Sequence, residues 1–419
     1  MAESAETRRR WSGGADVVVA VVATYFVVCV AWLVVSVLKR SVGDYGLLEG
    51  WIGPQYFADY SHGFVRRGLP GAVLGLLSDR SPRAVLVAMW VLTFAALAGV
   101  VVVAGRLLAR LRNGARTHIP LLLAVIVVSP ISVSEIVLDP GRYDFIGIIA
   151  AAGFVGVGLL RQKWLVLVLA ALVAAVAVAG EELLLVFVVP LVLLCVRRVS
   201  VQPIPRARVL RIVGVVLAPA LVLAALSALM RPSASFVASM LAGAGHPPTE
   251  VYNSATVLRL SLSDEIRLAY DWSRGLPNMV LSAVVWLAVY STAVGAVAVL
   301  LPRAVQGYWR AAGYFALVAL GLGLVGVDNR RWWTLAFLVQ LAYAAMAPPG
   351  DQPEQLSTWC ARRRIRAEVV VPALALVVAL VTYDLPLTTI FVSDVANHDY
   401  LVGLDRVWRA PLHWLVGRV

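Results

Sequence analysis

Long apolar runs alternate with short polar segments along almost the whole chain. About eleven of these runs are long enough to form helices that cross, or nearly cross, a lipid bilayer. The expected spans are 17–38, 84–105, 118–138, 145–160, 164–179, 182–197, 209–230, 278–301, 311–327, 332–347 and 367–384. The pattern therefore predicts an all-α, polytopic integral membrane protein that forms a single transmembrane domain over 1–419, without an internal repeat.

Charge indicates how these spans are oriented. If the N-terminus is cytoplasmic, strict alternation places every second polar segment inside, and each of those segments is basic. The inner segments hold more than half of the 36 Lys and Arg residues but only a quarter of the 24 acids. Membrane insertion selects for such an inner excess of basic residues. We therefore predict a cytoplasmic N-terminus and an extracytoplasmic C-terminus.

The same bias explains the net charge of +12 without a nucleic-acid partner. No basic face with interleaved aromatic residues is visible, and a nucleic-acid-binding surface would carry one. Only 14% of the residues are charged and 61% are hydrophobic, whereas a soluble domain carries roughly 25% charged residues. The bias toward Ala, Val, Arg and Gly is typical of a high-GC bacterium, so we expect the bacterial inner (plasma) membrane.

Three extracytoplasmic segments are long. The first, 39–83, is expected to form amphipathic helices, and the second, 231–277, is rich in small and polar residues before it becomes amphipathic. The third, 385–419, carries Trp408 and Trp414 and is expected to lie at the membrane interface. Acids gather with arginines on this outer side, which the insertion bias does not explain. We therefore expect a functional site that faces away from the cytoplasm.

The hairpin 164–197 is short for two membrane spans. Two helices of about 16 residues each reach roughly 24 Å at about 1.5 Å per residue, whereas the hydrocarbon core is about 30 Å thick. The turn that contains Glu181 and Glu182 is therefore expected below the outer surface, in a depression floored by short helices. Ionisable groups at such a depth are functional candidates. The alternative is a pair of acids wetted at the surface.

The first outer segment contains Asp59, His62 and Arg66 at spacings that place them on one face if the segment is helical. Arg67 follows directly, and Asp44 is a second acid nearer to the end of the first span. An acid beside His and arginines suits the removal of a proton next to an anionic group, which arginine binds through paired donors. The alternative is an interfacial helix that pairs with itself and with lipid headgroups.

A second outer turn holds Glu135, Asp139, Arg142 and Asp144 around a Pro-Gly pair that makes the turn. These side chains predict a ligand or metal site. The alternative is a turn in which Arg142 bridges the neighbouring acids.

A third outer turn has the sequence Asp328, Asn329, Arg330, Arg331, Trp332, Trp333. Arginines on the outer side oppose the positive-inside bias, which makes them informative. We expect Arg330 and Arg331 to clamp a lipid phosphate or pyrophosphate, with Asp328 beside them and the tryptophans at headgroup level. Headgroup binding alone is the alternative.

Motifs for other chemistries are missing from the sequence. Cys29 and Cys195 lie in apolar runs and Cys360 lies in an inner segment, so no disulfide is expected. We find no zinc-ligand spacing, catalytic Ser/His/Asp order, Walker loop or Rossmann glycine pattern. No metal ligands and no cofactor are assigned, and a divalent metal is left open.

The layout as a whole resembles the GT-C superfamily of polytopic membrane glycosyltransferases. The shared features are an inner N-terminus, a long first outer segment with acids, a second long outer segment between the seventh and eighth spans, and an outer polar cavity. The resemblance implies a polyprenyl-phosphate sugar donor and an acid in the first outer segment that acts as base, here Asp59 or Asp44. It also implies arginines such as Arg330 and Arg331 on the donor phosphate. The first outer segment departs from the family pattern because it has no adjacent pair of acids.

The function expected from these features is transfer of a sugar to an envelope glycan, lipid or protein on the extracytoplasmic face, with inversion at the anomeric carbon. Membrane lipid and the lipid-linked donor are the expected partners. A transporter or flippase of a lipid-linked sugar or other anion is one alternative, although such proteins place their charges near the midplane and often show two related halves. An envelope glycan polymerase, ligase or acyltransferase is another, and a scaffolding role is the last.

Overall fold

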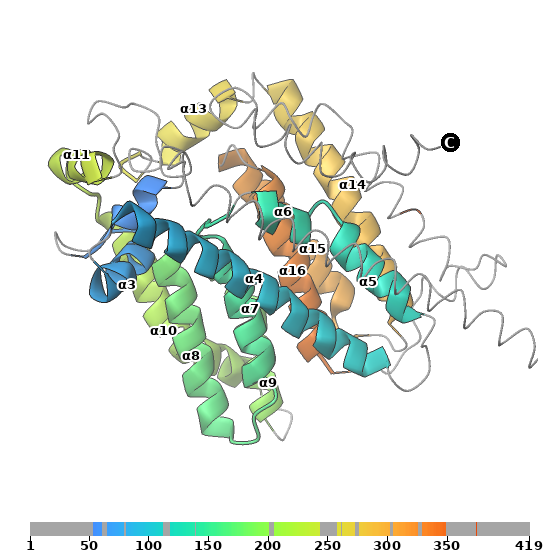
Figure 1. The fold of residues 1–419 in the computed structure, drawn as a ribbon. Helices are drawn as coiled ribbons and strands as arrows, with labels where there is room; N and C mark the ends of the chain where they lie inside the picture. The colour runs from blue at the N-terminus through green and yellow to red at the C-terminus, as the bar shows by residue number, and fades with distance from the viewer. Residues whose placement is uncertain are drawn as a thin grey trace, which may run out of the picture.

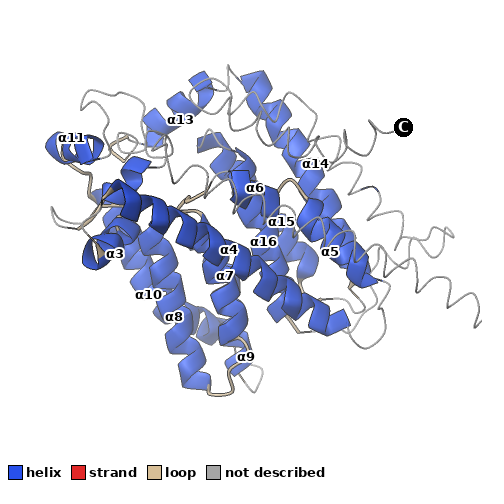
Figure 2. Cartoon of the chain, in the orientation of Figure 1, coloured by secondary structure: helices blue, strands red, loops and turns tan. Residues whose placement is uncertain are grey.

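The computed structural model describes residues 53–60, 65–78, 81–111, 118–138, 140–200, 205–243, 258–260, 262–272, 276–301, 305–325, 329–348 and Leu374. Regular secondary structure within these ranges consists of helices (Figures 1 and 2). The all-α prediction is therefore confirmed for the described part of the chain.

The helices follow the apolar runs of the sequence. The first are the 3-10 helix η1 (Gly53–Phe57), α3 (Leu69–Leu77) and α4 (Pro82–Leu111). The middle of the chain forms α5 (His118–Val128), α6 (Val133–Leu138), α7 (Phe145–Val157), α8 (Lys163–Gly180), α9 (Leu184–Val199) and α10 (Arg206–Leu229). The last are α11 (Ala234–Gly243), α13 (Leu262–Trp272), α14 (Leu276–Leu300), α15 (Tyr308–Val325) and α16 (Asn329–Met346). In Figure 1, α11 and α13 lie at the top, and α8, α9 and α10 extend downward.

Four of the described helices are long and apolar enough to cross a membrane. They are Pro82–Arg110, Lys163–Gly180, Arg206–Leu229 and Met279–Leu300. Other described helices are shorter, such as α7 with 13 residues and α9 with 16 residues. The apolar helices indicate a membrane protein. The expected spans 17–38 and 367–384 lie outside the described residues, apart from Leu374.

One expected span is divided. The run 118–138 forms α5 and α6 rather than a single helix, and the break contains Pro130. Proline has no backbone N–H to donate and disfavours helical backbone angles at the residue before it, here Ser129. The last helical-type bond of α5 is donated by the Ser129 N–H to the carbonyl of Val125, at 3.2 Å. The prediction of one continuous helix was therefore wrong in its middle.

Close packing around α7 brings three helix ends together. A Cβ atom added to Gly147 would lie 2.7 Å from a methyl of Leu184 on α9 and 2.9 Å from a methyl of Leu335 on α16. Only glycine allows both neighbours to approach so closely at this level. Because Gly147 is near the start of α7, the starts of α7, α9 and α16 are held side by side.

The hairpin of α8 and α9 is as short as the sequence predicts. Helices of 18 and 16 residues are about 27 and about 24 Å long, less than the roughly 30 Å hydrocarbon thickness. Ala170, Ala174 and Ala177 on α8 are fully buried, and such small side chains let the helix pack closely against its neighbours. The turn between the two helices therefore lies against protein, with Glu181 buried.

Candidate functional site

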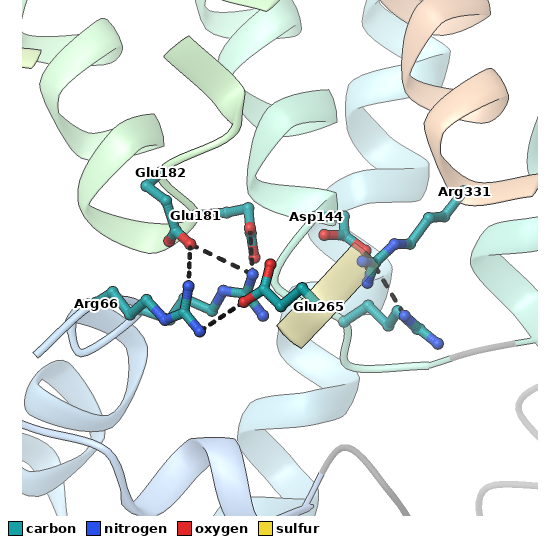
Figure 3. A network of polar contacts seen from close by, with 8 residues as sticks. Arg66, Asp144, Glu181, Glu182, Glu265 and Arg331 are labelled. Atoms are coloured by element: carbon teal, nitrogen blue, oxygen red, sulfur yellow. Dashed lines mark hydrogen bonds and ion pairs between the residues drawn. The ribbon is translucent and has the colours of Figure 1, made fainter. Parts of the chain in front are cut away.

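Four polar turns and one amphipathic helix meet at one end of the described bundle. One turn lies before α3 and a second lies before α7. A third joins α8 to α9, and the fourth is the first turn of α16. The amphipathic helix is α13. The side chains that meet are Arg66, Arg67, Arg142, Asp144, Glu181, Glu182, Glu265 and Arg331, and we call them the polar network (Figure 3). All but Glu265 were predicted from the sequence as site residues, on four separate loops.

The first half of the network pairs two arginines with three carboxylates. Arg67 Nη2 lies 2.9 Å from Glu181 Oε1 and 3.4 Å from Glu182 Oε1. Arg66 Nη1 lies 3.6 Å from Glu182 Oε1, and Arg66 Nη2 donates to Glu265 Oε1 at 2.8 Å. We call this group the acidic half, because it has one more carboxylate than guanidinium.

The second half brings two arginines to Asp144. Arg331 Nη1 donates to Asp144 Oδ2 at 3.2 Å, and Arg142 Nη1 lies 3.9 Å from the same oxygen. The guanidinium of Arg331 also lies over the Trp332 ring, 4.3 Å from its centroid, which stabilises the cation. The Nε atom of Arg331 is buried and has no hydrogen-bond partner. We call this group the basic half.

The two halves act on each other electrostatically. Asp144 raises the pKa of Glu181, and Arg331 lowers it, although both belong to the basic half. Asp144 also contributes to the raised pKa of Arg67. A change of charge in one half therefore shifts the pKa values of groups in the other half.

The backbone at Arg67 is strained. Its φ of 63° makes it the one non-glycine residue with positive φ among those described. A left-handed conformation costs on the order of 1–3 kcal/mol for such a residue, and it persists where the surroundings determine it. The side chain is 9% exposed, and its buried Nε atom has no hydrogen-bond partner. Strain and an unsatisfied donor at one residue are features of functional sites.

Burial gives the two adjacent glutamates different proton affinities. Burial raises the pKa of Glu181 to about 8, against the opposing field of Arg67 and with help from Glu182 and Asp144. Burial also acts on Glu182, but Arg67 and Arg66 outweigh it and lower the pKa of that carboxyl. For Arg67, burial disfavours the charge, and the four carboxylates around it more than compensate, so its pKa is raised. The turn therefore combines an ionised carboxylate with one that titrates near neutral pH.

Arg330 and Arg331 point to different partners. Arg330 Nε lies 2.8 Å from Glu135 Oε2 and donates to the carbonyl of Pro130 at 2.9 Å. These contacts fasten the start of α16 to the segment between α5 and α6, and Glu135 is bound there too. The expected clamp of adjacent arginines is thus divided between an anchoring residue and a member of the polar network. Trp332 and Trp333 are buried in the core rather than exposed at headgroup level.

Asp59 is held in the same region through its neighbours. It is buried, in a stretch without regular secondary structure that follows η1. Tyr56 on η1 donates its hydroxyl to the carbonyl of Gly141 at 2.6 Å, and the N–H of Gly141 donates to Thr93 Oγ1 at 2.8 Å. These bonds tie the first outer segment to the turn before α7. Gly141 has φ +83°, and a Cβ there would lie 2.6 Å from Met89.

The helical face expected of Asp59, His62 and Arg66 runs through residues 61–64, which lie outside the described residues. Asp59 lies outside regular secondary structure and Arg66 lies in a turn, and the left-handed backbone of Arg67 is incompatible with a right-handed helix. The common helical face of the three side chains stays a prediction. His62, Asp44, Asp139 and Asp328 lie outside the described residues.

Glu265 is the member of the network that sequence analysis missed. It lies in the first turn of α13, which was recognised only as an amphipathic stretch. Its partner Arg66 is 199 positions away in the sequence. An acid in an amphipathic stretch of the sequence was the only available signal.

Other potential ligands do not gather in the same way. Among the residues that the structure describes, no group of three or more His, Cys, Asp or Glu side chains is arranged to hold a metal ion. Cys195 is a free and buried thiol on α9. Comparisons with protein-family models, with curated proteins and with solved structures give no match to this chain.

Proposed function

We propose that this protein is a membrane glycosyltransferase of the bacterial inner membrane, with about eleven spans and a cytoplasmic N-terminus. It moves a sugar from a polyprenyl-phosphate donor to an envelope glycan, lipid or protein on the extracytoplasmic face. One observation carries the proposal: arginines and acids from turns far apart in sequence meet in one buried network at the ends of apolar helices.

The basic half supplies the phosphate site. Arg142 and Arg331 both lie near Asp144, so two guanidinium groups are brought to one place in this half. Arginine presents several fixed donors that match phosphate oxygens. The buried Nε–H group of Arg331 has no hydrogen-bond partner and can donate to a ligand. A phosphate oxygen at Arg331 would satisfy that donor.

A carboxylate of the first outer segment supplies the base. In the transfer, the acceptor hydroxyl oxygen bonds to the anomeric carbon as the bond from that carbon to the donor phosphate oxygen breaks. The bonding electrons leave with the polyprenyl phosphate, and the hydroxyl proton passes to a carboxylate. We assign that carboxylate to Asp59, with Asp44 as the alternative from the sequence. The arginines stabilise the second negative charge that develops on the departing phosphate.

The position of the charges favours transfer over transport. The network residues lie in turns and in the first turn of α16, at helix ends rather than in the middle of the long apolar helices. Transporters of charged substrates typically bind them near the bilayer midplane, at broken helices. A site at the helix ends suits a donor whose lipid chain remains in the membrane while its sugar meets an acceptor from outside.

Lipids that copurify with the full-length protein test the proposal. Native membranes are solubilised, and the lipids bound to wild type, to Arg331→Ala and to Arg310→Ala are identified by mass spectrometry. Arg310 is the control, because it is an exposed arginine near the opposite end of the bundle. We expect a polyprenyl-phosphate sugar on wild type and Arg310→Ala, and at least a tenfold loss in Arg331→Ala.

The same experiment can overturn the proposal. If every variant carries only bulk phospholipid, or if the three lipid profiles are equal, Arg331 does not hold a donor phosphate. If the sugar lipid is found, the next assay is turnover with that donor by Asp59→Asn. A rate equal to that of wild type would remove Asp59 as the base.

A further inference from the structure

The turn between α8 and α9 holds buried hydrogen-bonding atoms of both kinds that lack a partner. Arg67 Nη2 lies 2.9 Å from Glu181 Oε1, but its hydrogen bond goes to Glu182 Oε1 at 3.4 Å. Within the described part of the chain, two acceptors, Glu181 Oε1 and Glu182 Oε2, and one donor, Arg67 Nε, are buried without a hydrogen-bond partner. The side chains of Arg67 and Glu181 are only 9% and 2% exposed. Such buried groups are rare in folded proteins, and each calls for an explanation.

The mixture of donors and acceptors indicates the chemistry of a ligand. A phosphodiester has no proton to donate, and it would be repelled by the two carboxylates. A cationic group can only donate, so it would leave Arg67 Nε without an acceptor. A hydroxyl group both donates and accepts, and a sugar ring carries several hydroxyls at fixed spacings. Sugar hydroxyls are therefore the ligand groups that match all three atoms.

This turn lies directly against the start of α7. A Cβ atom on Gly180, the residue before Glu181, would overlap the side chain of Ile146. Ile146 is two residues beyond Asp144, which accepts a hydrogen bond from Arg331 Nη1 at 3.2 Å. The glutamates and Arg331 therefore lie at the same end of neighbouring helices (Figure 3). A sugar bonded to a phosphate at Arg331 has its ring next to that phosphate and can extend toward the turn.

We propose that the turn between α8 and α9 is a subsite for the sugar that the lipid phosphate carries. Glu182 and Glu181 accept hydrogen bonds from hydroxyls of this sugar, and Arg67 Nε donates to one of them. The inference rests on the proposed function, which places the donor phosphate at Arg331. It assigns the two glutamates to recognition of the sugar, whereas the base remains a carboxylate of the first outer segment.

A subsite of this kind selects its sugar by the pattern of hydroxyls. A buried site that hydrogen-bonds a hydroxyl rejects an analogue that lacks it, because the protein groups are then left unpaired. Hydrogen bonds to an ionised carboxylate are also stronger than those between neutral groups. We therefore expect the number and position of the hydroxyls to decide how tightly a sugar donor binds.

Binding of matched phosphodiesters to the full-length protein tests the proposal by isothermal titration calorimetry. Hexyl phosphates that carry arabinose, glucose, mannose or galactose are compared with hexyl methyl phosphate, which has the same charge and no sugar. The protein is kept in lauryldimethylamine oxide, because detergents with sugar headgroups would compete for the subsite. We expect one or more of the sugar diesters to bind roughly tenfold or more tightly than the methyl diester.

Deoxy analogues of the preferred sugar test the role of its hydroxyls on wild-type protein alone. Each analogue lacks one hydroxyl and is otherwise identical to its parent. We expect removal of a hydroxyl that contacts the turn to weaken binding by roughly fivefold or more. This series decides the question even where a variant of the turn does not fold.

Two variants assign the sugar preference to the turn. Glu182→Gln replaces the charged acceptor by an amide of the same size, and Asp271→Asn makes the same kind of change at an exposed carboxylate of α13. The readout is the affinity for the sugar diester divided by that for the methyl diester, because a change of charge acts on both probes alike. We expect this ratio to fall roughly fivefold or more in Glu182→Gln and to be unchanged in Asp271→Asn. A size-exclusion profile establishes that each variant is folded.

The outcomes separate this inference from the proposed function. If no sugar diester binds more tightly than the methyl diester, or if every deoxy analogue binds as tightly as its parent, the sugar subsite is overturned and the phosphate site remains. A ratio that Glu182→Gln leaves at the wild-type value removes the turn from sugar recognition. If none of the diesters binds, or if Arg331→Ala binds them as tightly as wild type, the phosphate site is overturned and with it both proposals.

Discussion

At the scale of single residues, Arg67 combines a strained backbone with a buried charge. Its φ is 63°, and its guanidinium lies against Glu181 and Glu182 within an almost fully buried site. A buried ion pair contributes little net stability over apolar packing, but removal of one partner is costly. We infer that the role of Arg67 lies in its effect on the two carboxylates, since neither its conformation nor its burial is favourable alone.

Substitution of Arg67 tests this reading. Arg67→Ala leaves two carboxylates buried without their shared cation, and we expect a loss of about 3–5 kcal/mol in unfolding free energy. The double variant Arg67→Ala/Glu181→Gln removes one stranded charge and should recover part of the loss. Denaturant unfolding in detergent micelles measures both, with the exposed Arg310→Ala as a control expected within about 0.5 kcal/mol of wild type. Strictly additive effects would show that Arg67 and Glu181 do not interact.

The raised pKa of Glu181 also predicts how stability depends on pH. A carboxyl with a pKa of about 8 when folded, against 4.5 ordinarily, binds its proton more tightly in the folded protein. Its contribution is fully present below about pH 4.5 and is lost as the pH rises through about 8. We expect the melting temperature of wild type to fall from pH 5 to pH 9 more steeply than that of Glu181→Gln. Parallel curves for the two proteins would contradict the assignment.

The sequence predicted most of the network residues but not their pairing. Charges at the ends of apolar runs are anomalous in a membrane protein, and this singled out Arg66, Arg67, Asp144, Glu181 and Arg331. Pairing depends on how turns far apart in the chain approach each other, which no local pattern contains. For that reason the separation of Arg330 from Arg331, and the participation of Glu265, became visible only in the structure.

At the scale of elements, apolar runs bounded by charges predicted the helices well. The expected spans 145–160 and 164–179 correspond to α7 (Phe145–Val157) and α8 (Lys163–Gly180). The prediction failed where backbone chemistry interrupts a run, at Pro130 within 118–138. Hydrophobicity determines which segments are buried, but turn residues determine where a helix stops.

The close approach of α7 to α9 and α16 gives a prediction at this scale. Gly147→Val would place side-chain carbons within 3 Å of Leu184 and Leu335, so α9 and α16 must move away. Because these helices begin beside Glu182 and Arg331, we expect at least tenfold less copurified polyprenyl-phosphate sugar than with wild type, and a lower melting temperature. Gly156→Ala on the same helix is the control, since its added Cβ meets nothing within 4 Å. Unchanged binding by Gly147→Val would mean that the packing does not set the geometry of the network.

At the scale of the whole molecule, the two ends of the bundle differ in charge. The polar network of mixed charge lies where α7, α9 and α16 begin and α8 finishes. At the opposite end, Arg110 donates to the carbonyls of Ala344 and Ala347 at 2.7 and 2.6 Å, where a cation stabilises the C-terminal end of α16. Arg161 and Arg310 are exposed there as well. Among the described residues, one end of the bundle therefore carries these arginines and the other carries the polar network. If the positive-inside rule holds here, we expect the network to face outward.

This polarity predicts the accessibility of each end in intact cells. Single cysteines are placed at Ser235, an exposed residue of α11, and at Gln162, an exposed residue beside Arg161, after Cys29, Cys195 and Cys360 have been changed to serine. We expect a membrane-impermeant maleimide to label the position at Ser235 in intact cells, and the position at Gln162 only after permeabilisation. The reverse pattern would place the network in the cytoplasm, where a nucleotide sugar rather than a polyprenyl-phosphate sugar would be the available donor. Orientation therefore decides which donor class the four arginines can serve.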